Sequence, residues 1–328
     1  MEENARILEV AAASRGRLVA LHRVDPALGD AAAVAADARS ALEAGARGLK
    51  WHPRAEAFGM HHPAAAASAA VADELGVPIL IHAGRGMPHL GEGVVDLART
   101  YPGATFMLAH AAISDIAWIM EATRDLPNVV FDTSWWRPFD VAVLLTRARP
   151  GRLLFGSDPP YGSVTTGMQI TARVARACGF ADVAMRSLMG EAAGELLQID
   201  SVATGGDQRA AWGERRLPED DADMRRATGY IEAAMLLTLG RASAAESLEL
   251  ARHALRVPGS HEHADAAAVL RAALGVVGEL QARPPEDDRV GATMGIPVHL
   301  HEAVRLLVCT LAHAATPAIP VAGAGLLA

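Results

Sequence analysis

Six short apolar runs alternate with stretches of helical length between residue 17 and about residue 200. The runs are Leu18–Val24, Gly48–His52, Pro78–Ala83, Thr105–His110, Val129–Thr133 and Leu153–Ser157. Runs that are apolar almost throughout are typical of parallel strands, because crossover helices bury both of their faces. This repetition predicts an α/β fold, either a closed barrel or a doubly wound sheet.

The intervening stretches have the length and the period of amphipathic helices. They are Asp30–Ala44, Pro63–Leu75, Gly93–Tyr101, Asp115–Leu126, Phe139–Ala148 and Thr166–Cys178, with a last helix over Glu191–Leu197. A charged, glycine-containing segment follows, and only helical patterns come after it. We therefore expect a barrel-type domain over residues 1–200, a linker over 201–227 and an all-α accessory domain over 228–328.

Composition and charge exclude several classes of protein. Apolar residues make up 51% of the chain and charged residues 21%, which excludes a disordered polypeptide and supports a packed core. The net charge is −8 and no basic run occurs, so we expect no nucleic-acid partner. No apolar stretch reaches the roughly 18 residues that a membrane helix needs. The first residues carry acids where a signal peptide needs bases, which predicts a cytoplasmic protein.

Four ionisable side chains end four different apolar runs. His52, His82, His110 and Asp158 follow the runs GLKW, PILI, TFMLA and LLFGS. Parallel α/β proteins build their sites at the carboxyl ends of the strands. Histidines and a carboxylate that meet there suit a zinc-type metal and also acid–base chemistry near neutral pH. The alternative for each residue is a hydrogen-bonded structural role.

Lys50 is the only lysine of the chain, and it lies two residues before His52. Residues two apart share a face of a strand, so Lys50 is expected to line the same site or to extend to its rim and pair with an acid. Neither a GxGxxG nor a GxxxxGK[ST] loop is present, which argues against a nucleotide enzyme.

Taken together and in order, five motifs resemble the amidohydrolase-related family, in its aminocarboxymuconate-semialdehyde decarboxylase-like branch. They are GLKWHP, GVPILIHAG, FMLAHAA, LLFGSDPPYG and GEAAGELLQI, and the resemblance covers roughly residues 1–200. It implies a (β/α)8 TIM barrel that binds one divalent metal, zinc or alternatively manganese.

The resemblance also implies roles for individual residues. His82 matches a metal ligand, and Asp158 matches a residue that binds metal and takes a proton from water. His110 matches the residue that acts as acid–base or polarises the attacking water. Lys50 and His52 match positions that line the pocket.

Two arginines in loops beside the strand ends, Arg85 and Arg137, are candidates to hold a substrate carboxylate. The alternative for both is a solvated surface arginine.

One departure from the family pattern affects the metal site. The family opens with a strand that carries an HxH pair of ligands, whereas this chain has six strand runs and no HxH at its start. The pattern therefore predicts that the first two strands of the barrel are missing. Three explanations are open: a truncated gene or wrong start, a paralogue that has lost activity, or ligands supplied from elsewhere. His299–Leu300–His301, after GIPV, is a candidate for the third.

These observations lead to one functional hypothesis and two rivals. The first is a metal-dependent hydrolase of amide, ester or lactone bonds, or a non-oxidative decarboxylase, acting on a small carboxylate substrate. The second is a non-catalytic barrel remnant with a helical protein-interaction tail. An open parallel sheet exposes two edges, which a homodimer or the tail helices would cover. The third is a doubly wound sheet whose histidines fall in register by accident.

Overall fold

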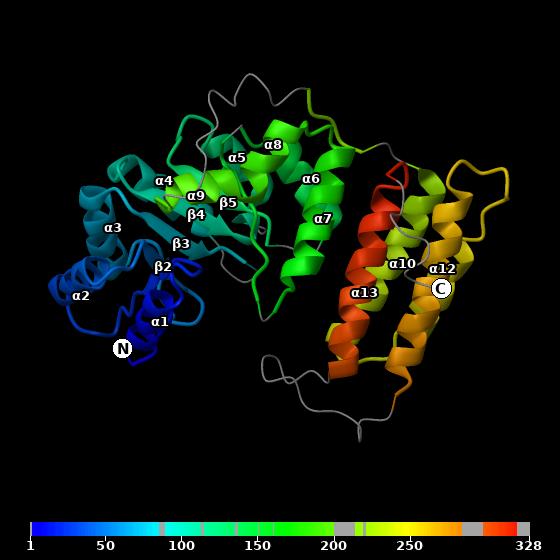
Figure 1. The fold of residues 1–328 in the computed structure, drawn as a ribbon, viewed down its shortest axis with the longest axis horizontal. Coiled ribbons are helices and arrows are strands. Elements are labelled where there is room, and N and C mark those ends of the chain that lie inside the picture. Colours follow the sequence, from blue (N-terminus) through cyan, green and yellow to red (C-terminus); the bar gives the residue numbers. More distant parts are fainter. Residues whose placement is uncertain are drawn as a thin grey trace. The chain divides into compact units, whose positions relative to one another are not determined.

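The computed structural model describes residues 2–84, 89–112, 115–134, 137–149, 151–159, 161–199, 214–218, 221–283 and 298–319. The chain divides into two compact units, coloured along the sequence in Figure 1. The first unit contains residues 1–134, 147–156 and 182–212, and the second contains 135–146, 157–181 and 213–328. The second unit thus includes two segments that come from within the expected barrel region.

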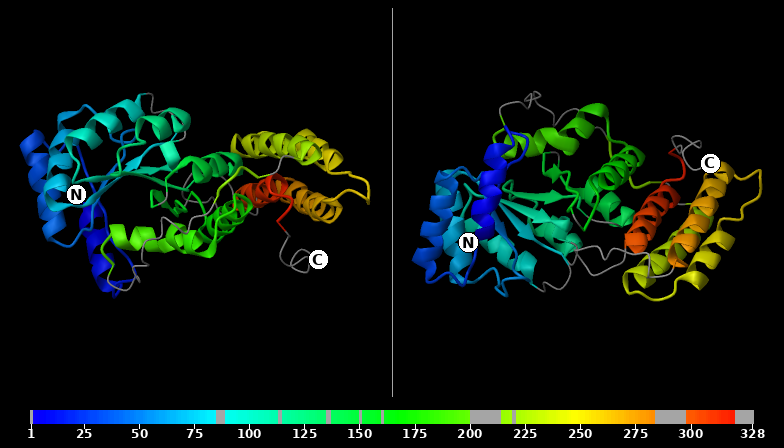
Figure 2. Two further views of the ribbon diagram at one scale, coloured as in Figure 1. Left: turned by 90° about the horizontal axis from the view of Figure 1, so that it is seen from above. Right: turned by 60° about the horizontal axis from the view of Figure 1, so that its bottom comes forward.

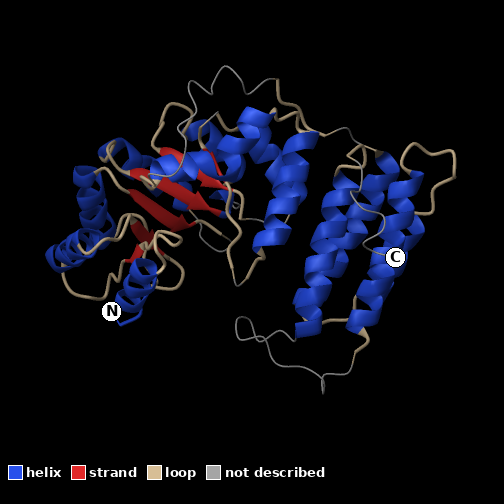
Figure 3. Cartoon of the chain, viewed as in Figure 1, coloured by secondary structure: helices blue, strands red, loops and turns tan. Residues whose placement is uncertain are grey.

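The first unit is built on a parallel sheet of six strands, drawn as arrows in Figure 3. They are β1 His22–Arg23, β2 Leu49–Trp51, β3 Pro78–His82, β4 Thr105–Ala109, β5 Val129–Asp132 and β6 Leu153–Leu154. Each strand pairs with its neighbour in the chain, in the order β1-β2-β3-β4-β5-β6. A doubly wound sheet reverses its order at a switch point, whereas barrel strands follow chain order. The six predicted strands and the barrel-type topology are therefore confirmed, and the doubly wound alternative is wrong.

Helices connect the strands and close the first unit. They are α1 Glu2–Ala13, α2 Ala31–Glu43, α3 Pro63–Leu75, α4 Leu90–Thr100, α5 Ile116–Ala122, α8 Asp182–Arg186 and α9 Ala192–Leu196, with short turns η1 His110–Ala112 and η2 Ser187–Glu191. Local signals set several ends. Asp30 caps α2 by accepting a hydrogen bond from the backbone N–H of Ala33 at 2.9 Å. Helix α3 starts at Pro63 and ends at Gly76, whose φ of 64° suits glycine.

The two faces of the sheet are covered in different ways. The face that carries Ile79, Phe106 and Phe131 is fully buried, and α3 and α4 pack against its strands. The opposite face carries Met107, Val130 and Leu154, and the side chains of Ala192, Ala193 and Leu196 in α9 pack against them. In a closed barrel, side chains of the other strands fill the space in front of this second face. The described sheet is open, and α9 takes that place.

Elements of the same unit cover both edge strands. The side-chain amide of Asn4, in α1, donates to the backbone oxygen of Arg23 at 2.8 Å and accepts from its N–H at 3.1 Å. Both groups lie on the edge of β1 that faces away from β2. Next to β6, the N–H of Phe155 donates to the carbonyl of Leu188 in η2 at 2.9 Å. At these positions the sheet edges are therefore covered by elements of the first unit itself.

The second unit is helical in its described residues. It contains α6 Pro138–Arg147, α7 Val164–Ala177, α10 Ala222–Leu239, α11 Ala245–Ala254, α12 Ala264–Gln281 and α13 Val298–Ala315. Helices α10 to α13 pack side by side, as both views of Figure 2 show, around buried residues such as Ile231, Leu274 and Leu307. Buried Arg173 in α7 donates to the hydroxyl of Thr316 at 2.7 Å, just after α13.

Two expectations about this unit need correction. Helix α10 begins at Ala222, inside the expected linker, because Asp221 accepts hydrogen bonds from the N–H groups of Asp223 and Met224. His299–Leu300–His301 lies in helix α13, so this segment is not a displaced first strand of the barrel. Among the described residues, no helix is long and apolar enough to cross a membrane.

Candidate active site

Three of the predicted site residues meet at the carboxyl ends of neighbouring strands in the first unit. His52 follows β2, His82 ends β3 and His110 follows β4. The rings of His52 and His82 are stacked, with centroids 4.1 Å apart and planes 11° apart. Nε2 of His110 lies 3.2 Å from Nδ1 of His82. The three imidazoles form one cluster, which we call the histidine cluster.

Strand register explains why these side chains meet. Lys50 lies opposite Leu80, Leu80 lies opposite Met107, and His82 lies opposite Ala109. Residues that lie opposite each other, or two apart on one strand, share a face of the sheet. Lys50 and His82 therefore lie on the same face as Met107, which is the face that α9 covers. The sequence prediction that strand-end histidines converge is thus realised within the first unit.

Charge and burial keep two of the imidazoles in the uncharged form. Burial, reinforced by the nearby His52, His110 and Lys50, lowers the pKa of His82 to about 3. Burial and the positive charge of Lys50 also lower the pKa of His52. An imidazole must be unprotonated at the atom that binds a metal or accepts a proton. At neutral pH the rings of His52 and His82 are therefore uncharged.

His110 has an unusual backbone conformation, which Asp132 at the end of β5 and Ser134 just after it hold in place. His110, Ala111 and Ala112 have φ angles of 60°, 55° and 52°, in the left-handed region that costs L-residues roughly 1–2 kcal/mol each. The Asp132 carboxylate accepts from the N–H of His110 at 2.9 Å. The carbonyl of Ser134 lies 2.7 Å from Nδ1 of the His110 ring.

Asp132 and Ser134 were missed in the sequence. Asp132 occupies the last position of strand β5, so the rule that selected the strand-end histidines also applies to it. Ser134 contacts His110 through its carbonyl, 2.7 Å from Nδ1, and through its hydroxyl, 3.1 Å from Nδ1 and 3.2 Å from the backbone nitrogen. A serine two residues after a strand carries no comparable signal in the sequence.

Glycines leave the space that the cluster needs. A Cβ atom at Gly84 would lie 3.0 Å from Nε2 of His82, and a Cβ at Gly156 would lie 2.9 Å from Oδ2 of Asp132. Any larger residue would press on these polar atoms. Gly84 therefore keeps the surroundings of the His82 Nε2 atom open.

Two further predicted site residues, Asp158 and Arg137, belong to the second unit. Asp158 belongs to the second unit, where its φ is 49° and its backbone oxygen accepts from the N–H of Gly162 at 2.7 Å. Arg137 also belongs to the second unit, and its Nε donates to Glu232 at 2.9 Å. It lines a cavity of about 330 Å³ in that unit. Arg85 lies outside the described residues.

We compared the donor atoms of the cluster with what a divalent metal needs. Nδ1 of His82 and Nε2 of His110 lie 3.2 Å apart, at hydrogen-bond distance from each other, which leaves Nε2 of His82 as the atom that could bind a metal. Burial keeps the His82 ring uncharged and Gly84 leaves room beside its Nε2 atom, which also fits a metal ligand. The cluster thus supplies a donor for a metal, whereas Asp158, the expected carboxylate ligand, belongs to the second unit.

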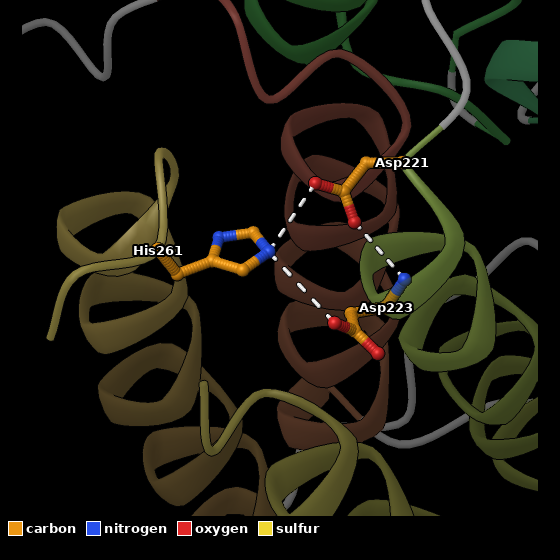
Figure 4. A group of neighbouring side chains, drawn as sticks. All are labelled: Asp221, Asp223 and His261. Carbon is orange, nitrogen blue, oxygen red and sulfur yellow. Dashed lines mark hydrogen bonds and ion pairs between the residues drawn. The ribbon is translucent and has the colours of Figure 1, made fainter. Parts of the chain in front are cut away.

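Within the described residues, one group of three side chains brings His, Cys, Asp or Glu ligand atoms within 4.8 Å of one another, and it lies in the second unit. Figure 4 shows its members, Asp221, Asp223 and His261. Nε2 of His261 lies 3.5 Å from Asp221 and 3.8 Å from Asp223. Because Nδ1 of His261 accepts from the N–H of His263, the proton of an uncharged ring is on Nε2 and faces the carboxylates. We interpret this group as ion pairs and hydrogen bonds at the capped start of α10.

Fold and site together define a parallel α/β protein of barrel topology with a histidine-lined site at its strand ends. A family model described as amidohydrolase matches residues 1–199, more than half of the chain. The chain therefore belongs to the amidohydrolase family, which confirms the resemblance of its motifs at the level of the family, while the decarboxylase-like branch stays a prediction.

A solved structure with a TM-score above 0.5 supports the fold, and two others are similar to part of the chain. An uncharacterised TIM-barrel protein from Bordetella bronchiseptica is 17% identical, with a TM-score of 0.52 over 60% of this chain and 72% of that chain. A putative amidohydrolase from Staphylococcus aureus is 14% identical, with a TM-score of 0.49 over 60% and 79%. The 5-carboxyvanillate decarboxylase of Sphingomonas paucimobilis is 13% identical, with a TM-score of 0.47 over 60% and 71%. No curated protein sequence matches this chain.

Proposed function

We propose that this chain is a divalent-metal-dependent enzyme that hydrolyses an amide, ester or lactone bond, or removes a carboxyl group, in a small carboxylate substrate. The observation that carries the proposal is the histidine cluster at the strand ends, in which Nε2 of His110 lies 3.2 Å from Nδ1 of His82 and leaves Nε2 of His82 to bind a metal. Membership of the amidohydrolase family supports the same class of chemistry.

His82 and Asp158 are the proposed metal ligands, with zinc as the first candidate and manganese as the second. An imidazole nitrogen and a carboxylate oxygen both suit either ion. A divalent ion bound there would lower the pKa of a bound water toward 7 and polarise a carbonyl or carboxylate group. His82 suits this role because burial and neighbouring positive charge keep its ring uncharged.

The other residues of the site bind substrate and move protons. His110 and Asp158 accept and return the proton of the attacking water in hydrolysis, or deliver a proton to carbon in decarboxylation. Lys50 and His52 line the substrate side of the cluster, where the single lysine supplies a positive charge for a carboxylate. Arg85 and Arg137 are the further proposed substrate contacts, although Arg137 already pairs with Glu232.

Metal content measured by elemental analysis tests this proposal. The full-length parent is purified, incubated with zinc or manganese and desalted. We expect close to one ion per chain, and we expect the His82→Ala and Asp158→Ala variants to lose it. His261→Ala is the matched control, because it removes a histidine from the other cluster of potential ligands.

Two outcomes would overturn the proposal. A parent that binds no metal after incubation with excess would leave a non-catalytic scaffold as the better explanation. A metal that survives His82→Ala but is lost in His261→Ala would place the ion at the start of α10. If the metal is found as expected, release of carbon dioxide or of an acid from a panel of carboxylates, amides and lactones separates decarboxylation from hydrolysis.

A further inference from the structure

We infer that Asp132 and Ser134 are positioning residues that fix which ring nitrogen of His110 and His82 carries the proton, so that His82 offers its Nε2 atom to a ligand. The inference deepens the proposed function and rests on it for the identity of that ligand. One chain of hydrogen bonds connects Asp132 to His82 through Ser134 and His110.

Asp132 anchors the chain. Its Oδ1 atom accepts from the N–H of His110 at 2.9 Å, from the N–H of Ser134 at 2.9 Å and from the hydroxyl of Ser134 at 2.5 Å. A carboxylate can accept several such bonds, and charge makes each of them stronger than a neutral one. These bonds place the backbone of Ser134 against the ring of His110.

The carbonyl of Ser134 then determines the tautomer of His110. A carbonyl oxygen only accepts, so Nδ1 of His110, at 2.7 Å, must be the donor. In an uncharged ring the proton on Nδ1 leaves Nε2 with a lone pair. Nε2 of His110 is therefore the basic atom of this ring, as its proposed role in proton transfer requires.

The same logic passes to His82. Nε2 of His110 lies 3.2 Å from Nδ1 of His82. Because Nε2 of His110 carries a lone pair, it can only accept in this hydrogen bond. Nδ1 of His82 therefore donates, and Nε2 of His82 is unprotonated. That atom is the one beside Gly84, where a Cβ would come within 3.0 Å, and the stacked ring of His52 covers one face of His82. Metal-binding histidines commonly donate their second ring N–H to a fixed partner, and here that partner is His110.

Long-range ¹H–¹⁵N NMR spectra of the full-length, metal-free protein labelled with ¹⁵N-histidine test the inference directly. These spectra show which ring nitrogen carries the proton, and single His→Gln variants assign the signals. We expect the proton on Nδ1 in both His82 and His110. We expect Asp132→Ala to convert His110 to a mixture of both tautomers, and Asp132→Asn to keep the parent state because its amide oxygen still accepts. Ser134→Ala should also keep the parent state, since it retains the carbonyl.

Asp73→Ala is the matched control, because it also removes a carboxylate that accepts a hydrogen bond from a backbone N–H. Oδ1 of Asp73 accepts from the N–H of Gly103 at 2.6 Å in the same unit, and no ring of the histidine cluster is involved. This variant should leave the tautomers of both histidines unchanged. A general loosening of the fold would affect Asp73→Ala as well, so a change confined to Asp132→Ala identifies positioning.

Zinc titration provides the second readout. We expect Asp132→Ala to bind zinc about 10–100-fold more weakly than the parent, as for other residues that orient metal ligands, while Asp132→Asn and Asp73→Ala stay near the parent. A proton on Nε2 of His110 in the parent, or tautomers unchanged in Asp132→Ala, would overturn the inference. Failure of the parent to bind zinc while the tautomers are as expected would contradict the proposed function alone.

Discussion

His313 links the stability of the second unit to pH. It is buried in α13, and its Nδ1 atom lies 2.8 Å from the carbonyl of Cys309. Burial lowers the pKa of His313 from its ordinary value of 6.5, and the positive charge of Arg173 lowers it further. The hydrogen bond to the Cys309 carbonyl raises the pKa but does not offset these two effects. The unfolded chain therefore takes up the proton first as pH falls, and the free energy of unfolding contributed by His313 decreases below about pH 6.5.

We expect His313→Gln to lose stability more slowly than the parent between pH 7.5 and pH 5.5. Urea unfolding at both pH values measures the difference, and subtracting the two curves removes the contribution of the other histidines. His253→Gln is the control, because His253 is exposed near the end of α11. Equal pH dependence in the parent and in His313→Gln would contradict this account.

Helix α9 stabilises the first unit by covering the face of the sheet that a closed barrel keeps inside. Ala193 packs with Ala192 and Leu196 against Met107, Val130 and Leu154. We expect Ala193→Asp to lower the free energy of unfolding by roughly 2 kcal/mol or more, because it brings a charge against apolar side chains.

Glu195→Ala is the control on the same helix, because Glu195 is exposed. It should change stability by under about 0.5 kcal/mol. Urea unfolding followed by circular dichroism gives both values. If Ala193→Asp proves as stable as the parent, α9 does not cover this face in solution.

In the molecule as a whole, both edges of the parallel sheet are covered, which protects the chain from pairing with strands of other chains. The open hydrogen-bonding groups of Arg23 on β1 are satisfied by the side chain of Asn4 rather than by a further strand. Exposed strand edges promote pairing with other chains. We expect Asn4→Ala to increase self-association with concentration, and to cost about 1–2 kcal/mol of stability.

Sedimentation velocity at several concentrations compares this variant with the parent. Glu3→Ala is the control, because Glu3 is exposed on the same helix. This substitution removes a charge and leaves the contact between Asn4 and β1 in place. Identical sedimentation of Asn4→Ala and the parent would show that the edge is protected in another way.

Much of the first unit could be predicted from local pattern. Burial on both faces leaves a continuous apolar run, so each of the six strands is visible in the sequence, and helix α3 matches its predicted bounds of Pro63–Leu75. The strand-end position of His52, His82 and His110 follows from chain order and from the common direction of parallel strands. Their convergence could therefore be predicted before any contact was known.

Other features depend on which segments pack against each other, and the periodicity of a segment does not identify its packing partner. Segments 135–146 and 157–181 look like the connections of a barrel, yet they pack into the second unit. The amphipathic pattern of α9 shows that it needs an apolar partner, and only the tertiary structure identifies the inner face of the sheet as that partner. The proton positions inferred for His110 and His82 likewise depend on a backbone carbonyl at Ser134, brought from 24 residues away along the chain. Contacts between distant segments are decided by the packing of the whole unit, and the fine chemistry of the site follows from those contacts.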